Sequence, residues 1–305
     1  MSRLKDWISA FRLRTLPLAF SCILMGSGLA IYDGSFKLNI FILTLVTTLF
    51  LQILSNLAND YGDSQNGADN DARVGPKRAV QSQSITKEAM RRAILILVFL
   101  SLGAGIPLVW ISTSTWNPIW LFSFLALGLL SVWAAIRYTS GSNPYGYRGL
   151  GDLFVFLFFG VVGVVGSYQL QAQNVLPILV DEMIYLAISV GLLSTAVLNL
   201  NNMRDLKSDQ IAGKNTVALN LGFKKAKVYH LMIISIAILC FNIAIYRLDY
   251  TVFQVICCNL PTALFSVHLL KVIKVKEEKD YDPELKKVAL ATFAQAMIFI
   301  FFSVS

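Results

Sequence analysis

Nine stretches of mostly apolar residues, each about 20 residues long, constrain this 305-residue chain more than any other feature of its sequence. They lie at about 15–33, 38–58, 93–112, 118–136, 150–170, 184–203, 229–246, 251–273 and 288–305. An α-helix rises about 1.5 Å per residue, so about 20 apolar residues cross the hydrocarbon core of a bilayer. The sequence therefore predicts an all-α membrane protein with nine transmembrane helices.

The composition supports this fold class. Hydrophobic residues make up 56% of the chain and charged residues 14%, whereas about a quarter of a soluble protein is charged. The net charge of +8 could indicate a nucleic-acid partner. We exclude one because Lys and Arg lie in short loops between apolar stretches, where they orient membrane helices. The cysteines form no CxxC pair and the two histidines lack nearby partners, so neither residue type predicts a metal site.

The positions of Lys and Arg predict the orientation of the chain. With the N-terminus in the cytoplasm, all 26 Lys and Arg residues except Lys37 and Arg247 fall on the cytoplasmic side. The positive-inside rule then places the C-terminus outside. We expect the first stretch to be a helix of the mature protein, since it is too long for the core of a signal peptide. No linker divides the chain, so residues 1–305 are expected to form a single transmembrane domain.

Polar residues end the second and the sixth apolar stretch in a similar pattern. The second runs into NLANDYGDSQNGAD, in which Asp60 and Asp63 share a face if the helix continues. The sixth runs into NLNNMRDLKSDQIAGKNT, in which Asp205 and Asp209 share a face. The two helices are four spans apart and run in the same direction. We therefore expect an internal repeat whose two clusters meet at one membrane surface and face a central cavity.

Four carboxylates placed together would repel one another unless protons or a cation neutralise them. Oxygen ligands suit Mg²⁺, which usually takes one or two carboxylates and completes its shell with water and substrate phosphates. The sequence therefore predicts one or two Mg²⁺ ions that hold a diphosphate between the clusters. Neighbouring amides and basic residues would bind that diphosphate: Asn56, Asn59, Arg73, Lys77, Arg78, Asn202 and Lys214. The alternative is that the aspartates are solvated loop residues and that the basic residues only set the topology.

At these residues the chain resembles the UbiA superfamily of intramembrane aromatic prenyltransferases. Asn59, Asp60 and Asp63 match its NDxxD-type motif, and Asp205 and Asp209 match its DxxxD-type motif. The resemblance covers the whole chain and implies nine helices with a cytoplasmic active site. The segments NDYGDSQNGAD, ARVGPKR, RYTSGSNPYGYRGLGD and NNMRDLKSDQIAGKNT look like the branch that prenylates 1,4-dihydroxy-2-naphthoate in menaquinone synthesis.

The chain departs from the superfamily pattern at the third carboxylate of each motif. Asp69 stands six residues after Asp63, with Gly67 at the usual four-residue spacing, and Gly213 stands four residues after Asp209. We therefore expect Asp69 to be either a metal ligand or a residue that supports the ligands. We assign no third carboxylate to the second motif.

The resemblance implies a reaction in which polyprenyl diphosphate and 1,4-dihydroxy-2-naphthoate give demethylmenaquinone, CO₂ and diphosphate. Asp60, Asp63, Asp205 and Asp209 would be the catalytic residues, and Mg²⁺ with the basic side chains would stabilise the departing diphosphate. An allylic cation would form in a dry cavity with aromatic and apolar walls. The expected location is a bacterial inner (cytoplasmic) membrane, where the polyprenyl tail contacts membrane lipid. No obligate protein partner is expected.

The segment RYTSGSNPYGYRGLGD, which links the fourth and fifth stretches, is rich in Tyr, Gly and Pro. We expect it to fold toward the cavity and to bind the acceptor through two arginines and three tyrosines: Arg137, Tyr138, Tyr145, Tyr147 and Arg148. The tyrosines would offer ring faces and hydroxyl groups, and one arginine would pair with the acceptor carboxylate. The alternative is a plain turn with interfacial tyrosines.

Two other functions remain open from the sequence. A related prenyltransferase would use 4-hydroxybenzoate or homogentisate as the acceptor. A membrane transporter could also carry polar residues and repeats, but its site would lie near the midplane in broken helices. The charges of this chain cluster at one membrane surface instead. The prenyl chain length and the oligomeric state do not follow from the sequence.

Overall fold

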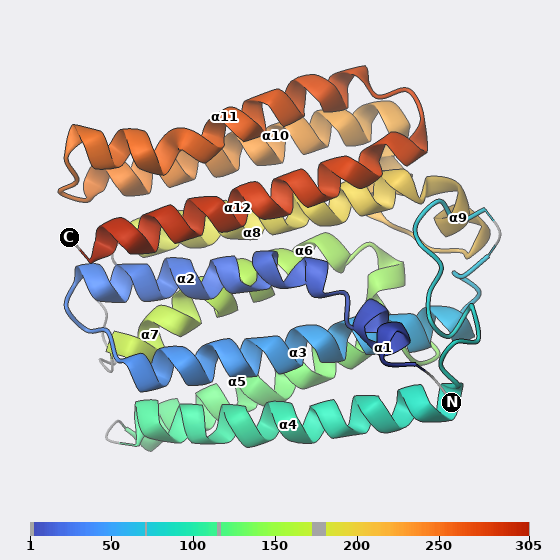
Figure 1. Cartoon of the computed structure of the whole chain (residues 1–305), viewed down its shortest axis with the longest axis horizontal. Coiled ribbons are helices and arrows are strands. Elements are labelled where there is room, and N and C mark those ends of the chain that lie inside the picture. The colour runs from blue at the N-terminus through green and yellow to red at the C-terminus, as the bar shows by residue number, and fades with distance from the viewer. Residues whose placement is uncertain (1–2, 71, 115–116, 173–180, 305) are drawn as a thin grey trace.

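A computed structural model describes residues 3–70, 72–114, 117–172 and 181–304. Within these ranges, nine helical segments are long and apolar enough to cross a membrane. They lie side by side in one bundle (Figure 1). The predicted all-α membrane architecture with nine spans is confirmed for the described part of the chain.

Several spans are built from more than one helical element. The first comprises α1 (Leu4–Phe11), η1 (Leu13–Thr15) and α2 (Leu16–Tyr32). Spans two to four are the single helices α3 (Leu38–Gln65), α4 (Lys87–Thr113) and α5 (Pro118–Arg137). The fifth span has three parts, α6 (Gly151–Val155), η3 (Phe156–Val165) and α7 (Gly166–Ala172). Spans six to eight are the helices α8 (Asp181–Arg204), α10 (Val217–Arg247) and α11 (Val252–Lys274). The ninth comprises η4 (Glu278–Tyr281) and α12 (Asp282–Ser303), and the short helices η2 (Tyr145–Arg148) and α9 (Leu206–Ile211) lie between spans.

Several helices extend beyond the predicted apolar ranges, and α3 and α10 bear on the site. α3 continues past residue 58 to Gln65 and therefore carries Asp60 and Asp63 on helical backbone. α10 begins at Val217 rather than near residue 229, and it is broken at Gly222, where φ is 71° and ψ is 165°. Hydropathy reports only the part of a helix that lies in the hydrocarbon core. A helix that continues into the polar interface is therefore longer than its apolar stretch.

The two helices that carry the aspartate motifs finish at the same end of the bundle. In Figure 1, α3 and α8 both run toward the end where α9 lies, and the N-terminus is at that end as well. The C-terminus lies at the opposite end, as an odd number of spans requires. We call the end with α9 the motif end. Its location in the cytoplasm stays a prediction.

α8 occupies the centre of the bundle. It packs against α2, α10, α12 and η3, and most of its side chains are buried. On the outer helices, Phe99, Phe122 and Phe253 are 73%, 67% and 67% exposed. Lipid tails solvate such side chains as well as a protein core does, so this apolar outer surface fits a bilayer.

The fifth span is irregular in a way that its apolar pattern did not predict. Its middle part, η3, is a π-helix, a rare conformation that often occurs at functional sites. Gly160 in η3 lies directly against α8, where a Cβ would come within 2.5 Å of the Ala187 carbonyl oxygen. Glycine at this position therefore allows the irregular span to pack closely on the central helix.

Candidate active site

Asp63 receives donors from three parts of the chain at the end of α3. The helix ends at Gln65, and Gly67 then takes a left-handed conformation with φ of 74°, as glycine commonly does after helix ends. The buried Asp63 carboxylate accepts hydrogen bonds from the Arg78 guanidinium and the Tyr147 hydroxyl. Lys214 Nζ lies 3.4 Å from Asp63 Oδ1. Two cations and one hydroxyl group thus surround this carboxylate.

Asp60 holds the 66–86 loop in place. Its buried carboxylate accepts hydrogen bonds from the backbone N–H groups of Ala79 at 3.0 Å and Val80 at 3.3 Å. The preceding residue, Arg78, donates to the Asn59 carbonyl at 3.1 Å. In this structure Asp60 therefore binds backbone, and it fixes the position from which Arg78 reaches into the site.

Asp205 lies at the junction of α8 and α9. Its Oδ1 accepts hydrogen bonds from the Gly75 N–H at 3.1 Å and from Arg204 Nε at 3.1 Å, and its Oδ2 accepts one from Arg204 Nη2 at 2.8 Å. Burial alone would raise the pKa of Asp205. The hydrogen bonds and charge of Arg204, with the charge of Arg73, outweigh burial and hold the pKa below its ordinary value. This carboxylate is therefore ionised.

Lys214 connects the second motif to the first. Its Nζ lies 3.3 Å from Asp209 Oδ1 and 3.4 Å from Asp63 Oδ1, and the side chain is only 12% exposed. Burial raises the pKa of Asp209 above its ordinary value, although the charge of Lys214 opposes the change. One lysine thus neutralises part of both carboxylates.

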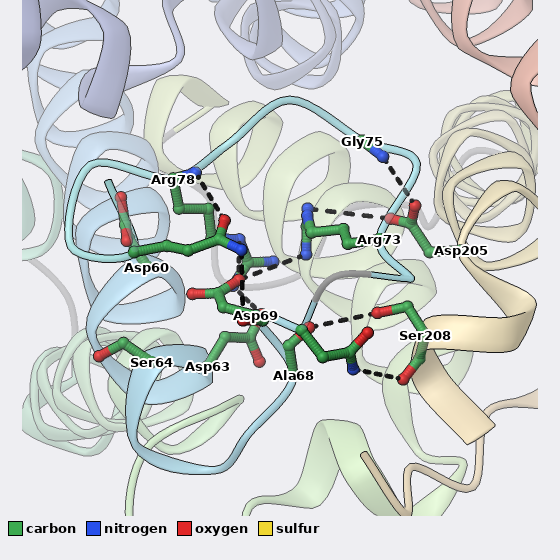
Figure 2. Close-up of polar contacts among 12 residues, drawn as sticks. Asp60, Asp63, Ser64, Ala68, Asp69, Arg73, Gly75, Arg78, Asp205 and Ser208 are labelled. Atoms are coloured by element: carbon green, nitrogen blue, oxygen red, sulfur yellow. Dashed lines mark hydrogen bonds and ion pairs between the residues drawn. The ribbon is translucent and has the colours of Figure 1, made fainter. Parts of the chain in front are cut away.

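Arg73 makes a second, longer connection between the motifs. Its guanidinium lies 3.7 Å from Asp69 and 3.8 Å from Asp205. The loops also meet directly, because Asn70 Nδ2 donates to the Ser208 carbonyl at 3.1 Å. Figure 2 shows Arg73 and Arg78 reaching from the 66–86 loop toward carboxylates that come from different segments. We call the aspartates gathered here the carboxylate cluster: Asp60, Asp63, Asp69, Asp205 and Asp209.

The other residues predicted to bind diphosphate, three asparagines and Lys77, differ in their contacts and their burial. Asn56 Nδ2 donates to the Phe11 carbonyl at 2.9 Å and so joins α3 to the N-terminal segment. The side-chain oxygen of Asn59 is buried without a hydrogen-bond partner. Asn202 is buried on α8, and Lys77 is exposed on the loop. Their role in diphosphate binding stays a prediction.

Residues 137–150, which we call the aromatic turn, contact the carboxylate cluster through Tyr147. The Tyr147 hydroxyl donates to Asp63, and Lys214 Nζ lies 4.8 Å from the centre of the ring, within the range of a cation–π contact. Burial and the nearby Asp63 charge raise the pKa of Tyr147. The hydroxyl therefore stays protonated and acts as a donor.

Tyr145 and Tyr138 turn away from the cluster toward the apolar interior. The Tyr145 hydroxyl donates to the Ala134 carbonyl at 2.8 Å. Its ring centre lies 4.1 Å from that of Phe154 in a stacked pair and 5.4 Å from that of Tyr138 in an edge-on pair. The aromatic turn therefore has a polar side at Tyr147 and an apolar side at Tyr138 and Tyr145.

The two arginines of the aromatic turn differ in exposure. Arg137 is half-buried and folds over Gly141, where a Cβ would lie 2.0 Å from Arg137 Nη1. Arg148 is exposed. Among the described residues, neither guanidinium lies within ion-pair distance of a carboxylate. Both are therefore available to an anionic ligand, and Arg137 is the more enclosed of the two.

A cavity of about 500 Å³ lies inside the bundle beside the aromatic turn. Tyr138 and Tyr145 line it together with apolar side chains from α2, α3, α4, α5 and the fifth span. Ser55 also lines the cavity, and Asp63 follows it on α3 by roughly 12 Å of helix. The arrangement places an apolar chamber next to charged groups, which suits a molecule with an anionic head and an apolar tail.

Comparison with known proteins decides the family. Residues 19–291 match the UbiA prenyltransferase family. The chain belongs to this family. Among its relatives, the 1,4-dihydroxy-2-naphthoate octaprenyltransferase of Escherichia coli is 45% identical over 240 residues, which cover 79% of this chain and 76% of the relative. The protein of the same name from Haemophilus influenzae is 44% identical over 78% of this chain and 76% of its own length.

Solved structures of other UbiA proteins share the fold. A UbiA homologue from Aeropyrum pernix gives a TM-score of 0.64 at 16% identity and covers 100% of this chain and 98% of its own. A homologue from Archaeoglobus fulgidus, bound to GPP and Mg²⁺, gives a TM-score of 0.61 at 14% identity, with coverage of 97% and 99%. At this identity the likeness extends to the fold alone.

The oxygen atoms in and beside the carboxylate cluster of this UbiA chain are suitable ligands for a hard divalent cation. Both carboxylate oxygens of Asp69 and the side-chain oxygen of Asn59 are buried without a hydrogen-bond partner, and Mg²⁺ takes oxygen ligands. Burial raises the pKa of Asp69 although the nearby Arg78 opposes it. Among the described residues, no three His, Cys, Asp or Glu side chains already converge as metal ligands. Protein cations such as Lys214 hold the carboxylates instead, and a divalent ion would take over those contacts.

Arg12 is a neighbour of the cluster that sequence reasoning missed. It joins α1 to η1 in a left-handed conformation, with φ of 48° and ψ of 53°, and it lies close enough to interact electrostatically with Asp60 and Asp63. We counted Arg12 only toward membrane topology. No sequence pattern links residue 12 to residues 60 and 63, because α1 must first fold back against α3.

Arg204 was missed as well, although its position offered a signal. It stands between the asparagines and Asp205 of the second motif. Its side chain is 2% exposed and pairs with Asp205 at 2.8 Å and with Asp282 at 2.5 Å. An arginine next to a motif aspartate could have been predicted to hold that carboxylate. Its second contact, with Asp282 at the start of α12, could be identified only from the structure.

Proposed function

We propose that this UbiA prenyltransferase transfers a polyprenyl group from polyprenyl diphosphate to 1,4-dihydroxy-2-naphthoate in a bacterial cytoplasmic membrane, with its site facing the cytoplasm. The observation that carries the proposal is the aromatic turn, which joins the carboxylate cluster to the apolar cavity. The relatives that are 45% and 44% identical bear the name of this activity.

The basic residues of the site bind the diphosphate end of the donor. Arg73 and Arg78 can each form bidentate hydrogen bonds with a phosphate group, and Lys214 contributes a single ammonium charge. All three lie within ion-pair distance of the carboxylate cluster. When bound, Mg²⁺ would neutralise charge on the diphosphate oxygens. The residues that would hold it are Asp60, Asp63, Asp205 and Asp209, with Asp69 beside them.

The apolar cavity receives the prenyl end. The bond between the prenyl C1 and the diphosphate oxygen breaks, and its electron pair leaves on the diphosphate. The allylic cation then lies beside Tyr138 and Tyr145, which line the motif end of the cavity. Their ring faces attract a cation, and the apolar walls exclude water that would otherwise capture it.

The acceptor enters beside the aromatic turn. A ring carbon bonds to the prenyl C1, the acceptor carboxylate leaves as CO₂, and its bonding electrons return to the ring. No electrons leave the pair of substrates, so the direct product is the reduced quinol form of demethylmenaquinone. Arg137, half-buried and without a carboxylate partner among the described residues, is the best placed cation for the acceptor carboxylate.

A panel of acceptors tests the proposed substrate. Purified protein in lipid nanodiscs is given one polyprenyl diphosphate, Mg²⁺ and either 1,4-dihydroxy-2-naphthoate, 4-hydroxybenzoate or homogentisate, and the product masses are measured. We expect the prenylated, decarboxylated naphthoate as the main product. A main product from either of the other acceptors would assign the chain to a related enzyme. Absence of metal-dependent diphosphate release with every acceptor would favour a transporter.

Two aspartate variants test the proposed site. Asp60→Asn and Asp205→Asn keep the side-chain shape but remove a charge, so each should lower kcat by roughly 100-fold, as loss of one preorganised electrostatic group does. Asp280→Asn, an exposed residue in η4, is the control and should leave kcat unchanged. Near-normal, Mg²⁺-dependent activity in both test variants would remove the carboxylate cluster from the mechanism.

A further inference from the structure

Two lysines come together where α11 meets α12 at the motif end. Lys271 lies in the last turn of α11 and Lys287 lies in α12, and the two side chains are close enough to interact directly. Figure 1 shows that α11 and α12 are joined at this end of the bundle. Like charges so close together repel each other. The positive-inside rule explains why lysines lie at this end, but it does not explain why two of them meet.

One carboxylate neutralises only part of this charge. Glu284 on α12 is buried, and its Oε1 forms an ion pair with Lys287. Its Oε2 lies 2.7 Å from His268 Nδ1, so both carboxylate oxygens are engaged. Among the described residues, no other carboxylate forms an ion pair with Lys271 or Lys287. The two ammonium groups therefore keep an excess of one positive charge.

A buried polar chain holds Lys287 in this position. His268 Nε2 lies 2.8 Å from Nε2 of His230 on α10, and the two histidines are 2% and 0% exposed. An ionised Glu284 accepts a hydrogen bond from His268 Nδ1, so His268 Nε2 in turn accepts one from His230. The chain thus runs from the core to Lys287 through three helices. Ionisable side chains buried within membrane spans are costly and generally mark functional sites.

Exposed apolar side chains continue from both lysines toward the opposite end of the bundle. They share a helix face with Lys271 on α11 and with Lys287 on α12, because they follow at helical spacing. These residues are Val267 and Leu264 on α11, which are 52% and 56% exposed, and Leu290 and Met297 on α12, which are each 44% exposed. α11 and α12 pack against each other. Together they present a surface with a basic end and two apolar rows.

A phospholipid with an anionic headgroup fits this surface. Its phosphate, placed between the two ammonium groups, would neutralise them and form charge-assisted hydrogen bonds with both. Its acyl chains would lie along the two apolar rows. Anionic headgroups attract lysine side chains at a membrane surface. A free phosphate ion would use only the basic end, whereas a lipid matches the charge and the apolar rows together.

We propose that α11 and α12 bind one anionic phospholipid at the motif end, with its phosphate on Lys271 and Lys287. None of the residues that form this site belongs to the carboxylate cluster or lines the apolar cavity. The site therefore takes a lipid that is neither substrate nor product, and its existence does not depend on the proposed function.

Native mass spectrometry of the delipidated protein tests the site. The Kd for phosphatidylglycerol and the Kd for phosphatidylcholine are measured with lipids that have identical acyl chains. The wild-type protein should bind phosphatidylglycerol more tightly, because the choline group would bring a cation toward the lysines. Lys271→Gln and Lys287→Gln should each raise the Kd for phosphatidylglycerol by about fivefold, and the double variant by about 25-fold, as loss of one and two lysines beside an anionic headgroup does. The Kd for phosphatidylcholine should change less.

The double variant Lys5→Gln/Lys87→Gln is the matched control. Lys5 on α1 and Lys87 at the start of α4 are exposed, and these helices lie across the bundle from α11 (Figure 1). The control removes the same net charge and should leave both Kd values unchanged. An unchanged Kd for phosphatidylglycerol in the test double variant, or an equal rise in the control, would overturn the inference. Displacement of phosphatidylglycerol by excess inorganic phosphate would also overturn it, since the site would then bind a free anion.

Discussion

At the scale of the residue, the carboxylates of Asp63 and Asp205 already have cationic partners within the chain. Asp63 contacts Arg78 and Lys214, and Asp205 contacts Arg204. An ionised carboxylate that is buried without a partner is costly, so these contacts explain how the aspartates tolerate their burial. A substrate must therefore exchange partners with the protein's own cations rather than fill an open pocket.

Arg12 should contribute to binding of the donor. Arg12→Gln removes its charge beside Asp60 and Asp63, and we expect the KM for polyprenyl diphosphate to rise by about tenfold, as loss of a charge-assisted hydrogen bond does. The KM for the acceptor should change little. Steady-state kinetics with each substrate varied in turn measures both values.

Arg14→Gln is the control for that experiment. Arg14 lies in η1, close to Arg12 in the chain, but its side chain is exposed. It should leave both KM values unchanged. Equal effects of the two substitutions would mean that Arg12 acts only through membrane topology or general charge.

At the scale of the element, the aromatic turn separates its two arginines. Arg137 is half-buried and Arg148 is exposed, although the sequence offered no reason to prefer either. We expect Arg137→Ala to raise the KM for 1,4-dihydroxy-2-naphthoate by roughly tenfold, with little change in the KM for polyprenyl diphosphate. Arg148→Ala should have the smaller effect. A reversed order would place the acceptor on the outer side of the turn, and unchanged kinetics in both variants would leave it a plain interfacial turn.

The helices themselves could be predicted because lipid imposes a simple requirement on them. Twenty apolar residues in a row have few alternatives in a membrane, so α5 and α11 lie close to their predicted ranges. The π-helix over Phe156–Val165 could not be predicted in this way. It depends on how Gly160 packs against Ala187 of a helix that comes later in the chain, and an apolar pattern carries no information about that contact.

The candidate site, like the helices, could be predicted from the sequence only in part. Asp60, Asp63, Asp205 and Asp209 could be selected from spacing alone, because helical positions three or four apart share a face. The partner of each carboxylate could not. Asp60 binds the backbone at Ala79, and that contact depends on the path of the 66–86 loop, which no local pattern determines.

At the scale of the whole molecule, the distribution of Lys and Arg predicts that the motif end faces the cytoplasm. Two variants test this in intact cells with a thiol reagent that does not cross membranes. Asp249→Cys lies in the exposed connection between α10 and α11 at the far end, and Lys276→Cys lies between α11 and η4 at the motif end. We expect labelling of Asp249→Cys in intact cells and of Lys276→Cys only after lysis.

The native cysteines give a low background for that experiment, because Cys22, Cys240 and Cys258 are buried and Cys257 is partly buried. Labelling of the wild-type protein gives the remaining background from the native cysteines. Labelling of Lys276→Cys alone in intact cells would invert the orientation and place the site outside.

The cation contacts around Asp63 and Asp205 also bear on how the protein matures. In small zinc domains the ligands cannot assemble until the metal arrives, so metal binding and folding are one event. Here Arg78, Lys214 and Arg204 neutralise the carboxylates within the chain itself. We therefore expect the chain to insert and fold in a cell depleted of divalent ions, and a metal that binds later would require no refolding.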